Sequence, residues 1–277
     1  MARKRKLEGS TAIVTGGSSG IGLAAACLLA SGGANVAIAA RRTDVLGEAV
    51  ALIRSAQTNH EQFVEATSLD VADRRAVADY AHTFARAHGT PDIIINSAGI
   101  THPGYFEEIP FEIFEEIMQV DYFGVLNVCR SFVPVMKVRG GHIVNVASAA
   151  GLYGVFGYTA YSAAKFAVVG FSQALRSELK PNGIRVSVLC PVDTDTPQLA
   201  MENELKPKET HAISSGTADV MTPETVAEAL VDALFTNRFL IIPGREAKLA
   251  YLANRIAPGL LEQYLDGKIR RARSSAP

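Results

Sequence analysis

The chain has 277 residues, of which 48% are apolar and 20% are charged, and its formal net charge at pH 7 is −1. This composition is typical of a globular chain that buries a substantial core, and it excludes intrinsic disorder. A net charge near zero also argues against nucleic-acid binding as the main function.

Targeting and redox signals predict a cytoplasmic protein. The basic segment at residues 2–6 leads into Leu7-Glu8-Gly9-Ser10 rather than into a long apolar run, unlike a signal peptide. The longest apolar region, residues 21–40, is interrupted by glycines and predicts a helix, a turn and a strand instead of a membrane span. The cysteines are scattered and the histidines have no paired spacing, which predicts free thiols and no metal site.

Short β-branched runs alternate with helical patterns along most of the chain. Strands are predicted at Thr11–Thr15, Asn35–Ala40, Phe63–Ser68, Asp92–Ile95, His142–Ala147, Arg185–Cys190 and Phe239–Ile242. Helices are predicted at Ile21–Ser31, Asp44–Gln57, Arg74–Ala87, Phe111–Lys137, Tyr158–Lys180 and Pro223–Phe235. This alternation predicts a single α/β domain over residues 1–277, with a doubly wound parallel sheet of about seven strands and helices on both faces.

The first predicted strand runs directly into a glycine-rich turn that opens a helix. Glycines permit a tight turn and let backbone N–H groups approach a phosphate at the helix N-terminus. The glycines have the spacing G-x-x-x-G-x-G rather than the G-x-G-x-x-G of the dinucleotide fingerprint. The position between an apolar strand and a helix favours nucleotide binding. The predicted binding residues of this turn are Gly16, Ser18, Ser19, Gly20, Ile21 and Gly22.

The end of the second strand predicts which nucleotide is bound. It reads Arg41-Arg42 and has no acid at its carboxyl end. An acid there would bind a ribose 2′-hydroxyl, whereas arginine pairs with a 2′-phosphate. We therefore expect NADP(H) to be preferred over NAD. Asp44, slightly further on, is expected to be the N-cap of the next helix.

A tyrosine and a lysine four residues apart, Tyr161 and Lys165, form the most informative pair in the chain, and Ser148 precedes the tyrosine by 13 residues. On a helix the two side chains project from one face and can meet over a common pocket. A nearby cation lowers the pKa of a phenol from about 10, which makes it a usable proton donor to a carbonyl or acceptor from an alcohol. The alternative is a packed tyrosine beside a solvated lysine, but the glycine turn and the serine favour catalysis.

These features together resemble the short-chain dehydrogenase/reductase family over nearly the whole chain. The resemblance implies a Rossmann-type fold and reversible hydride transfer between a nicotinamide and a carbonyl, with Ser148, Tyr161 and Lys165 as catalytic residues. Asn96-Ser97-Ala98-Gly99 resembles the family's Asn-Asn-Ala-Gly element, and Val192 replaces a usual glycine after Pro191. By resemblance, the further cofactor-binding residues are Asp70, Val71, Asn96, Ala98, Gly99, Tyr161, Lys165, Pro191, Thr194 and Thr196.

One catalytic position departs from the family pattern. The family's asparagine, in an Asn-x-x-Gly stretch of the long fourth helix, corresponds to Asp121 in Asp121-Tyr122-Phe123-Gly124. By resemblance, this position anchors a water through its backbone carbonyl and so connects the lysine to solvent. Aspartate keeps the carbonyl but lacks the amide N–H donor, and its charge is expected to affect Lys165.

A narrower resemblance is to the 3-ketodihydrosphingosine reductases. It rests on Tyr158–Ala167, on the doubled Asp-Thr of residues 193–196, and on Glu202-Asn203 and Lys206-Pro207. It implies reduction of the ketone of a long-chain lipid with NADPH, and Asp193 or Asp195 is a candidate partner for the lipid's ammonium group. Alternatives are a reductase of a steroid, a 3-oxoacyl thioester or a xenobiotic ketone. A non-catalytic NADP-binding regulatory protein is also an alternative, but the intact triad argues against it.

Two segments lie outside the alternating pattern. Residues 191–220 are long for a connector and are predicted to form a substrate lid. In the tail, residues 245–273, Leu249, Leu252 and Ile256 share one helical face, and the end is basic. The tail is either a docking helix or an amphipathic helix that makes peripheral contact with an anionic membrane.

Partners follow from the same resemblance. The expected substrate is a small-molecule carbonyl compound, and no nucleic acid is expected. The family pairs its subunits through the helices that correspond to Phe111–Lys137 and Tyr158–Lys180, so a homodimer or homotetramer is expected.

Overall fold

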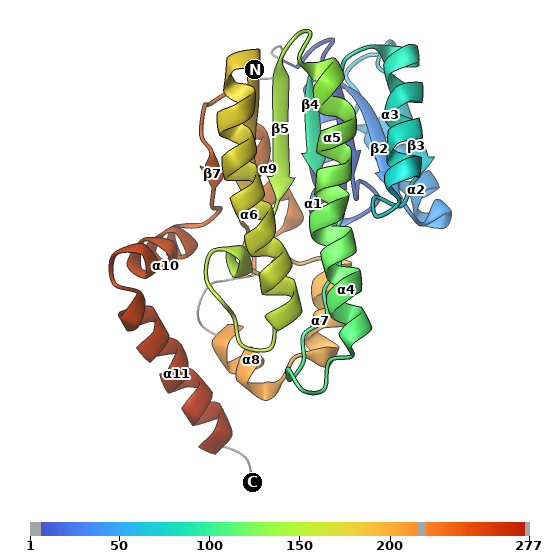
Figure 1. Ribbon diagram of the computed structural model, residues 1–277. Coiled ribbons are helices and arrows are strands. Elements are labelled where there is room, and N and C mark those ends of the chain that lie inside the picture. Colours follow the sequence, from blue (N-terminus) through green and yellow to red (C-terminus); the bar gives the residue numbers. More distant parts are fainter. Residues whose placement is uncertain (1–6, 215–219, 275–277) are drawn as a thin grey trace.

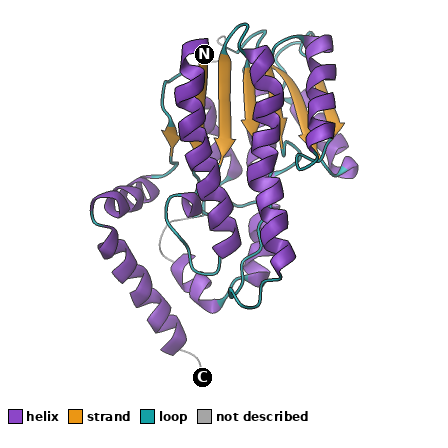
Figure 2. Ribbon diagram, in the orientation of Figure 1, coloured by secondary structure: helices purple, strands orange, loops and turns teal. Residues whose placement is uncertain are grey.

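A computed structural model describes residues 7–214 and 220–274 of the chain. Its centre is a seven-stranded sheet in the order β3-β2-β1-β4-β5-β6-β7, in which every neighbouring pair is parallel. The strands are β1 (Thr11–Thr15), β2 (Asn35–Ala40), β3 (Val64–Ser68), β4 (Ile93–Asn96), β5 (Gly141–Val146), β6 (Ile184–Leu189) and β7 (Leu240–Ile241). The predicted doubly wound parallel sheet is confirmed (Figures 1 and 2).

The central strands are apolar on both sides because helices cover both faces of the sheet. In β1, Ile13 faces one core, whereas Ala12 and Val14 face the other. The core on the Ala12 side is covered by α1 (Gly20–Ser31), α2 (Thr43–Ser55) and α9 (Pro223–Ala233). The core on the Ile13 side is covered by α3 (Arg74–His88), α5 (Gly124–Met136) and α6 (Thr159–Leu179) (Figure 1).

The strand order reverses at β1, which pairs with β2 on one side and with β4 on the other. Connections therefore leave in opposite directions from β1 and β4 and open a crevice at the carboxyl ends of the strands. In open α/β sheets, ligands bind at this point. The sequence places the glycine turn, Ser97-Ala98-Gly99 and Ser148 at these strand ends.

The predicted helix Phe111–Lys137 is one rod with a local widening. Helix α4 (Phe111–Ile117) passes into a π-helical turn, Met118–Phe123, which passes directly into α5. Turns of this type inside helices occur frequently at functional sites. Asp121 lies within the turn, where it is fully buried.

The capping role predicted for Asp44 is wrong. Helix α2 begins at Thr43, and Arg42 occupies the N-cap position without a side-chain capping hydrogen bond. Asp44 lies in the first turn instead, where its negative charge still interacts favourably with the helix dipole.

The lid and the tail are helical. The lid contains α7 (Pro197–Leu205) and α8 (Lys208–Ser214), and residues 215–219 of the predicted lid lie outside the described residues. The tail forms α10 (Arg245–Ile256) and α11 (Pro258–Ser274), and α11 packs against α8 outside the layers around the sheet (Figure 2). Across residues 7–214 and 220–274, no helix has the length and apolar character needed to span a bilayer.

Candidate active site

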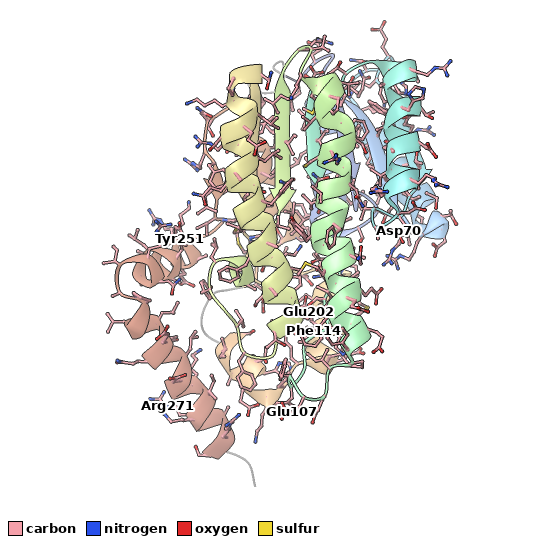
Figure 3. All side chains as sticks on the ribbon, viewed as in Figure 1. Asp70, Glu107, Phe114, Glu202, Tyr251 and Arg271 are labelled. Atoms are coloured by element: carbon pink, nitrogen blue, oxygen red, sulfur yellow. The ribbon has the colours of Figure 1, made fainter. Side chains whose placement is uncertain are left out.

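A cavity of about 480 Å³ lies at the carboxyl ends of the strands. It extends from Asp70, beside the glycine turn, to Glu202 of the lid, and Figure 3 labels both residues. The predicted site residues that line it are Gly16, Ser18, Ser19, Gly20, Ile21, Arg41, Arg42, Asp70, Val71, Ala98, Gly99, Ser148, Tyr161, Lys165, Pro191, Thr194 and Thr196. Three predicted residues, Gly22, Asn96 and Asp121, are not among its lining residues.

The glycine turn forms a cradle that side chains would fill. Gly16 has φ +66°, and a Cβ atom there would lie 2.6 Å from the carbonyl oxygen of Ser97. Gly20 has φ +53°, and its Cβ would lie 2.9 Å from the Cγ2 atom of Thr196. Ser19 precedes α1 and makes no side-chain capping hydrogen bond, so its hydroxyl does not cap the first turn of the helix. A turn with free helix N–H groups and no side chains in the way fits a phosphate-bearing cofactor.

Gly22 and Asn96 do not line the cavity but hold the elements around it in place. A Cβ atom on Gly22 would lie 2.3 Å from the carbonyl oxygen of Gly16, so this glycine lets α1 pack closely on the turn. The Asn96 side chain was predicted beside the cofactor but lies inside the sheet, where its Nδ2 donates to Oδ1 of Asn145 at 2.8 Å. Asn145 in turn donates to Ser172 Oγ of α6 at 2.8 Å. This buried chain of hydrogen bonds ties β4 and β5 to the helix that carries Tyr161 and Lys165.

The nucleotide end of the cavity carries both arginines. Arg41 and Arg42 are exposed and follow β2, and both line the cavity. Asp70 is also exposed, and its Oδ1 accepts the N–H of Ala72 at 2.9 Å. Val71 beside it is buried. The two cationic side chains at the cavity rim fit an anionic group on the cofactor.

Tyr161, Lys165 and Ser148 meet in the middle of the cavity. As the four-residue spacing predicts, Nζ of Lys165 lies 5.3 Å from the centre of the Tyr161 ring. The same ammonium donates to the carbonyl oxygen of Val146 at 3.3 Å. Ser148 follows β5, and its Oγ accepts the N–H of Ala150 at 3.1 Å. Tyr161 and Lys165 are 9% and 4% exposed, so solvent screens their interaction only weakly.

The pKa of Tyr161 is raised to about 12, contrary to the lowering that we predicted. Burial of the phenol is the largest cause, because it disfavours the phenolate. Lys165 does lower this pKa, as predicted, and the Ser148 hydroxyl adds to the lowering. The carboxylates of Asp121 and Glu202 raise it further. Tyr161 therefore holds its proton at neutral pH.

Asp121 forms a direct ion pair with Lys165. Its Oδ2 lies 3.0 Å from Nζ of Lys165, and its Oδ1 accepts the N–H of Ile100 at 2.8 Å. Burial, the largest single cause, lowers the pKa of Lys165, but the charge and hydrogen bond of Asp121 together with Tyr161 and Cys190 outweigh it, and the pKa is raised. Gly99 makes room for the pair, because a Cβ atom there would lie 3.2 Å from the lysine Nζ. Asp121 therefore affects Lys165 as expected. Its buried carboxylate does not line the cavity but provides a fixed negative charge beside the lysine ammonium.

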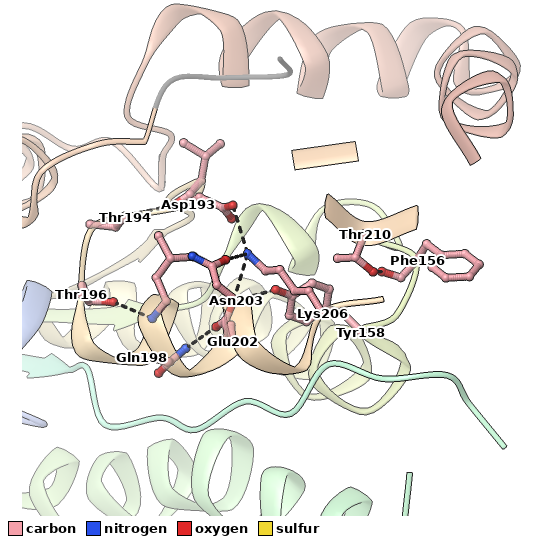
Figure 4. A network of polar contacts seen from close by, with 12 residues as sticks. Phe156, Tyr158, Asp193, Thr194, Thr196, Gln198, Glu202, Asn203, Lys206 and Thr210 are labelled. Atoms are coloured by element: carbon pink, nitrogen blue, oxygen red, sulfur yellow. Dashed lines mark hydrogen bonds and ion pairs between the residues drawn. The ribbon is translucent and has the colours of Figure 1, made fainter. Parts of the chain in front are cut away.

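The substrate end of the cavity contains two polar residues that the sequence analysis missed, Tyr158 and Glu202. The hydroxyl of Tyr158 donates to Oε2 of Glu202 at 2.6 Å, and both side chains line the cavity (Figure 4). Asp193 also lines it, whereas Asp195 is exposed and is not among the lining residues. Of the two aspartates proposed for an ammonium, only Asp193 has the required position. Tyr158 and Glu202 belong to the stretches that carry the narrower resemblance, but a glutamate four residues before a lysine is typical of an ordinary surface ion pair, so no site role was predicted for Glu202.

The tail closes one side of the same cavity. Its lining residues are Ala247, Ala250, Leu261, Tyr264 and Leu265. Nε of Arg273 lies 3.0 Å from Oε1 of Glu209 in the lid, and Nδ2 of Asn254 donates to the carbonyl oxygen of Leu152 at 3.3 Å. The tail does not dock through the face that Leu249, Leu252 and Ile256 share, because these side chains are 66%, 52% and 75% exposed.

Known proteins match this chain along most of its length. A family model described as short chain dehydrogenase matches residues 10–207. The 3-ketodihydrosphingosine reductase of Mus musculus is 42% identical over 83% of this chain and 70% of its own length. The 3-ketodihydrosphingosine reductase of Dictyostelium discoideum is 38% identical over 94% of this chain and 81% of its own length. A short chain dehydrogenase/reductase from Burkholderia phymatum, solved in complex with NAD, has a TM-score of 0.79 at 26% identity and covers 92% of this chain and 95% of its own.

The family match spans strands β1 to β6, the glycine turn and the segment that carries Ser148, Tyr161 and Lys165. The chain therefore belongs to the short-chain dehydrogenase/reductase family and is an oxidoreductase that acts on a carbonyl or hydroxyl group.

Proposed function

We propose that this protein reduces the ketone of 3-ketodihydrosphingosine with NADPH. The observation that carries the proposal is that one cavity joins Ser148, Tyr161 and Lys165 to apolar walls from the lid and the tail. Those walls include Leu199, Ile213, Leu261 and Leu265, which suit a hydrocarbon chain. The two 3-ketodihydrosphingosine reductases named above support the same substrate class.

The cofactor is held, in this proposal, by the residues that line the nucleotide end. The turn at Gly16–Gly20 would hold the phosphates, and Asp70 and Val71, which line the same cavity, would hold the adenine. Arg41 and Arg42 pair with a 2′-phosphate, which favours NADP(H). Pro191, Thr194 and Thr196 would hold the nicotinamide end, and the cofactor would supply or accept the hydride.

The proton chemistry belongs to the triad. Tyr161 keeps its proton at neutral pH and is placed to donate it to the ketone oxygen as negative charge develops there. Ser148 donates a hydrogen bond to the same oxygen, and Lys165 supplies positive charge beneath it. Asp121 holds the lysine in place through its 3.0 Å ion pair. Pre-placing these groups reduces the reorganisation needed in the transition state.

Lipid access and assembly complete the proposal. The tail exposes Leu249, Leu252 and Ile256 on one side while its other side lines the cavity, so a membrane surface can meet the tail next to the substrate's binding place. We also propose subunit pairing through α5 and α6. Phe123 at the start of α5 and Phe166 on α6 are 38% and 45% exposed.

The decisive experiment follows NADPH absorbance with purified protein and 3-ketodihydrosphingosine in mixed micelles. Tyr161→Phe removes the proton donor and is expected to lower turnover about 10²–10⁴-fold. NADPH binding, followed by fluorescence, is expected to persist in the variant. Reduction of a simple diketone or steroid but not of the lipid would contradict the substrate, and near-full turnover by Tyr161→Phe would contradict the triad.

A further inference from the structure

The cavity contains a buried carboxylate that neither the proton chemistry nor cofactor binding uses. Glu202 lies on α7, is 7% exposed and lines the substrate end. Burying a carboxylate is costly unless hydrogen bonds or a cation compensate it. An apolar side chain at this position would suit a plain hydrocarbon better, so the presence of the charge calls for a specific partner.

Glu202 is fixed close to the proton donor. Tyr158 donates to its Oε2 at 2.6 Å, and Nε2 of Gln198 donates to its Oε1 at 3.1 Å (Figure 4). The ring centres of Tyr158 and Tyr161 are 5.8 Å apart, so the tyrosine that holds the carboxylate packs beside the proton donor. A carboxylate has about four acceptor sites. These two hydrogen bonds leave capacity for a further donor.

The charges around this end of the cavity do not balance. Nζ of Lys206 is 3.8 Å from Oε2 of Glu202, but it is nearer to Oδ2 of Asp193, at 3.4 Å, and to Oδ1 of Asn203, at 3.0 Å. Asp193 and Glu202 line the cavity and Lys206 does not. Lys165 and Asp121 neutralise each other. In the described part of the chain, the two carboxylates that line this end thus share the single ammonium that contacts them, Lys206, which leaves one negative charge for a cationic ligand.

We infer that Glu202 is the residue that makes this enzyme specific for ketones bearing an ammonium group on the adjacent carbon. This inference rests on the proposed function and names the chemical feature that its substrate site selects. With the ketone oxygen at Tyr161, an ammonium one carbon away faces the Tyr158–Glu202 pair. It donates to the free acceptor sites of Glu202, and Asp193, which lies nearer to the Lys206 ammonium than Glu202 does, neutralises that competing cation.

The competing explanation is that Glu202 only anchors the lid through Tyr158 and Lys206. Glu209 provides a matched control, because it is another buried lid carboxylate, 2% exposed, that accepts from Tyr105 at 2.9 Å and pairs with Arg273. It is not among the cavity-lining residues. A purely structural role predicts that Glu202→Gln and Glu209→Gln behave alike.

The test compares kcat/KM for 3-ketodihydrosphingosine with kcat/KM for the same ketone without its amine. Gln at position 202 keeps an oxygen for the Tyr158 hydroxyl and removes the charge. Glu202→Gln is expected to lower kcat/KM for the amine-bearing ketone about 10- to 100-fold, the value of a charge-assisted hydrogen bond. The amine-free ketone is expected to be reduced as well as before or better, and Glu209→Gln is expected to keep the wild-type preference.

A binding measurement separates failure of this inference from failure of the proposed function. Calorimetry in the presence of NADP⁺ compares dihydrosphingosine with the amine-free diol of the same chain length. Tighter binding of the amine that depends on Glu202, without turnover of any ketone, would keep the inference and remove the reductase assignment. Equal losses for both ketones in Glu202→Gln, or equal binding of both lipids by the wild type, would overturn the inference and leave the reductase assignment intact.

Discussion

The cofactor end and the substrate end of the cavity are built from different kinds of contact. At the cofactor end, backbone approaches backbone, as where Gly16 meets the carbonyl of Ser97. At the substrate end, side chains far apart in sequence meet, as where Tyr158 donates to Glu202, 44 residues further along the chain. The first kind of contact demands particular residues at short spacing, whereas the second depends on how helices dock. A local sequence motif therefore predicts where the cofactor binds, whereas no local motif predicts which substrate is chosen.

Replacing Gly16 tests the cofactor end most severely. Gly16→Ala forces a side chain into φ +66° and 2.6 Å from the Ser97 oxygen. We expect the free energy of unfolding to fall by about 1–3 kcal/mol and NADPH affinity to fall with it. Urea unfolding and fluorescence titration measure the two effects.

The control for this change is Gly47→Ala in α2. Gly47 is exposed and a Cβ atom there meets nothing within 4 Å, so helix propensity alone should stabilise the protein by about 0.5–1 kcal/mol. If both substitutions had the same sign, close packing at the turn would not be what requires Gly16.

The arginine pair tests cofactor choice at the same end. We expect the double substitution Arg41→Ser with Arg42→Ser to raise the KM for NADPH about 10- to 100-fold and to leave the KM for NADH nearly unchanged. Steady-state kinetics with both cofactors measures the change. A parallel loss with NADH would show that the arginines hold the turn rather than a 2′-phosphate.

Asp121 lies between the two ends, and replacing it tests how its charge sets the pKa values of Tyr161 and Lys165. Its carboxylate raises the pKa values of both Lys165 and Tyr161. Asp121→Asn removes that charge, so the pKa of Tyr161 should fall. The rising limb of the pH profile for alcohol oxidation, which needs the phenolate, should therefore move to lower pH. Movement to higher pH would instead mean that Lys165 loses its proton without Asp121. An unchanged profile would contradict the coupling.

The same contrast explains how far the sequence predicts the structure. The strand pattern and the glycine turn predict the sheet because apolar β-branched runs between helices have few other ways to bury both faces. Asn96 follows the expected motif, yet its side chain turns into the sheet, since its acceptor Asn145 is 49 residues away in sequence and is itself bound to Ser172, 27 residues further on. Burial also reverses the expected pKa shift of Tyr161, because desolvation depends on the completed cavity and not on the four-residue spacing to Lys165.

Substitutions in the tail are expected to have the smallest effect on stability. They distinguish a tail that only docks on the lid from one that also contacts a membrane. Leu252 and Ile256 are exposed on the side away from the cavity, so Leu252→Glu with Ile256→Glu should change the free energy of unfolding by no more than about 0.5 kcal/mol. Binding to vesicles that contain anionic lipid should weaken clearly in a flotation assay, because the apolar face is lost. Leu52→Glu in α2 is the matched control, since Leu52 is 53% exposed and distant from the tail in the fold. If the control weakened vesicle binding equally, the effect would be one of net charge, and the tail would serve only as the wall of the substrate cavity.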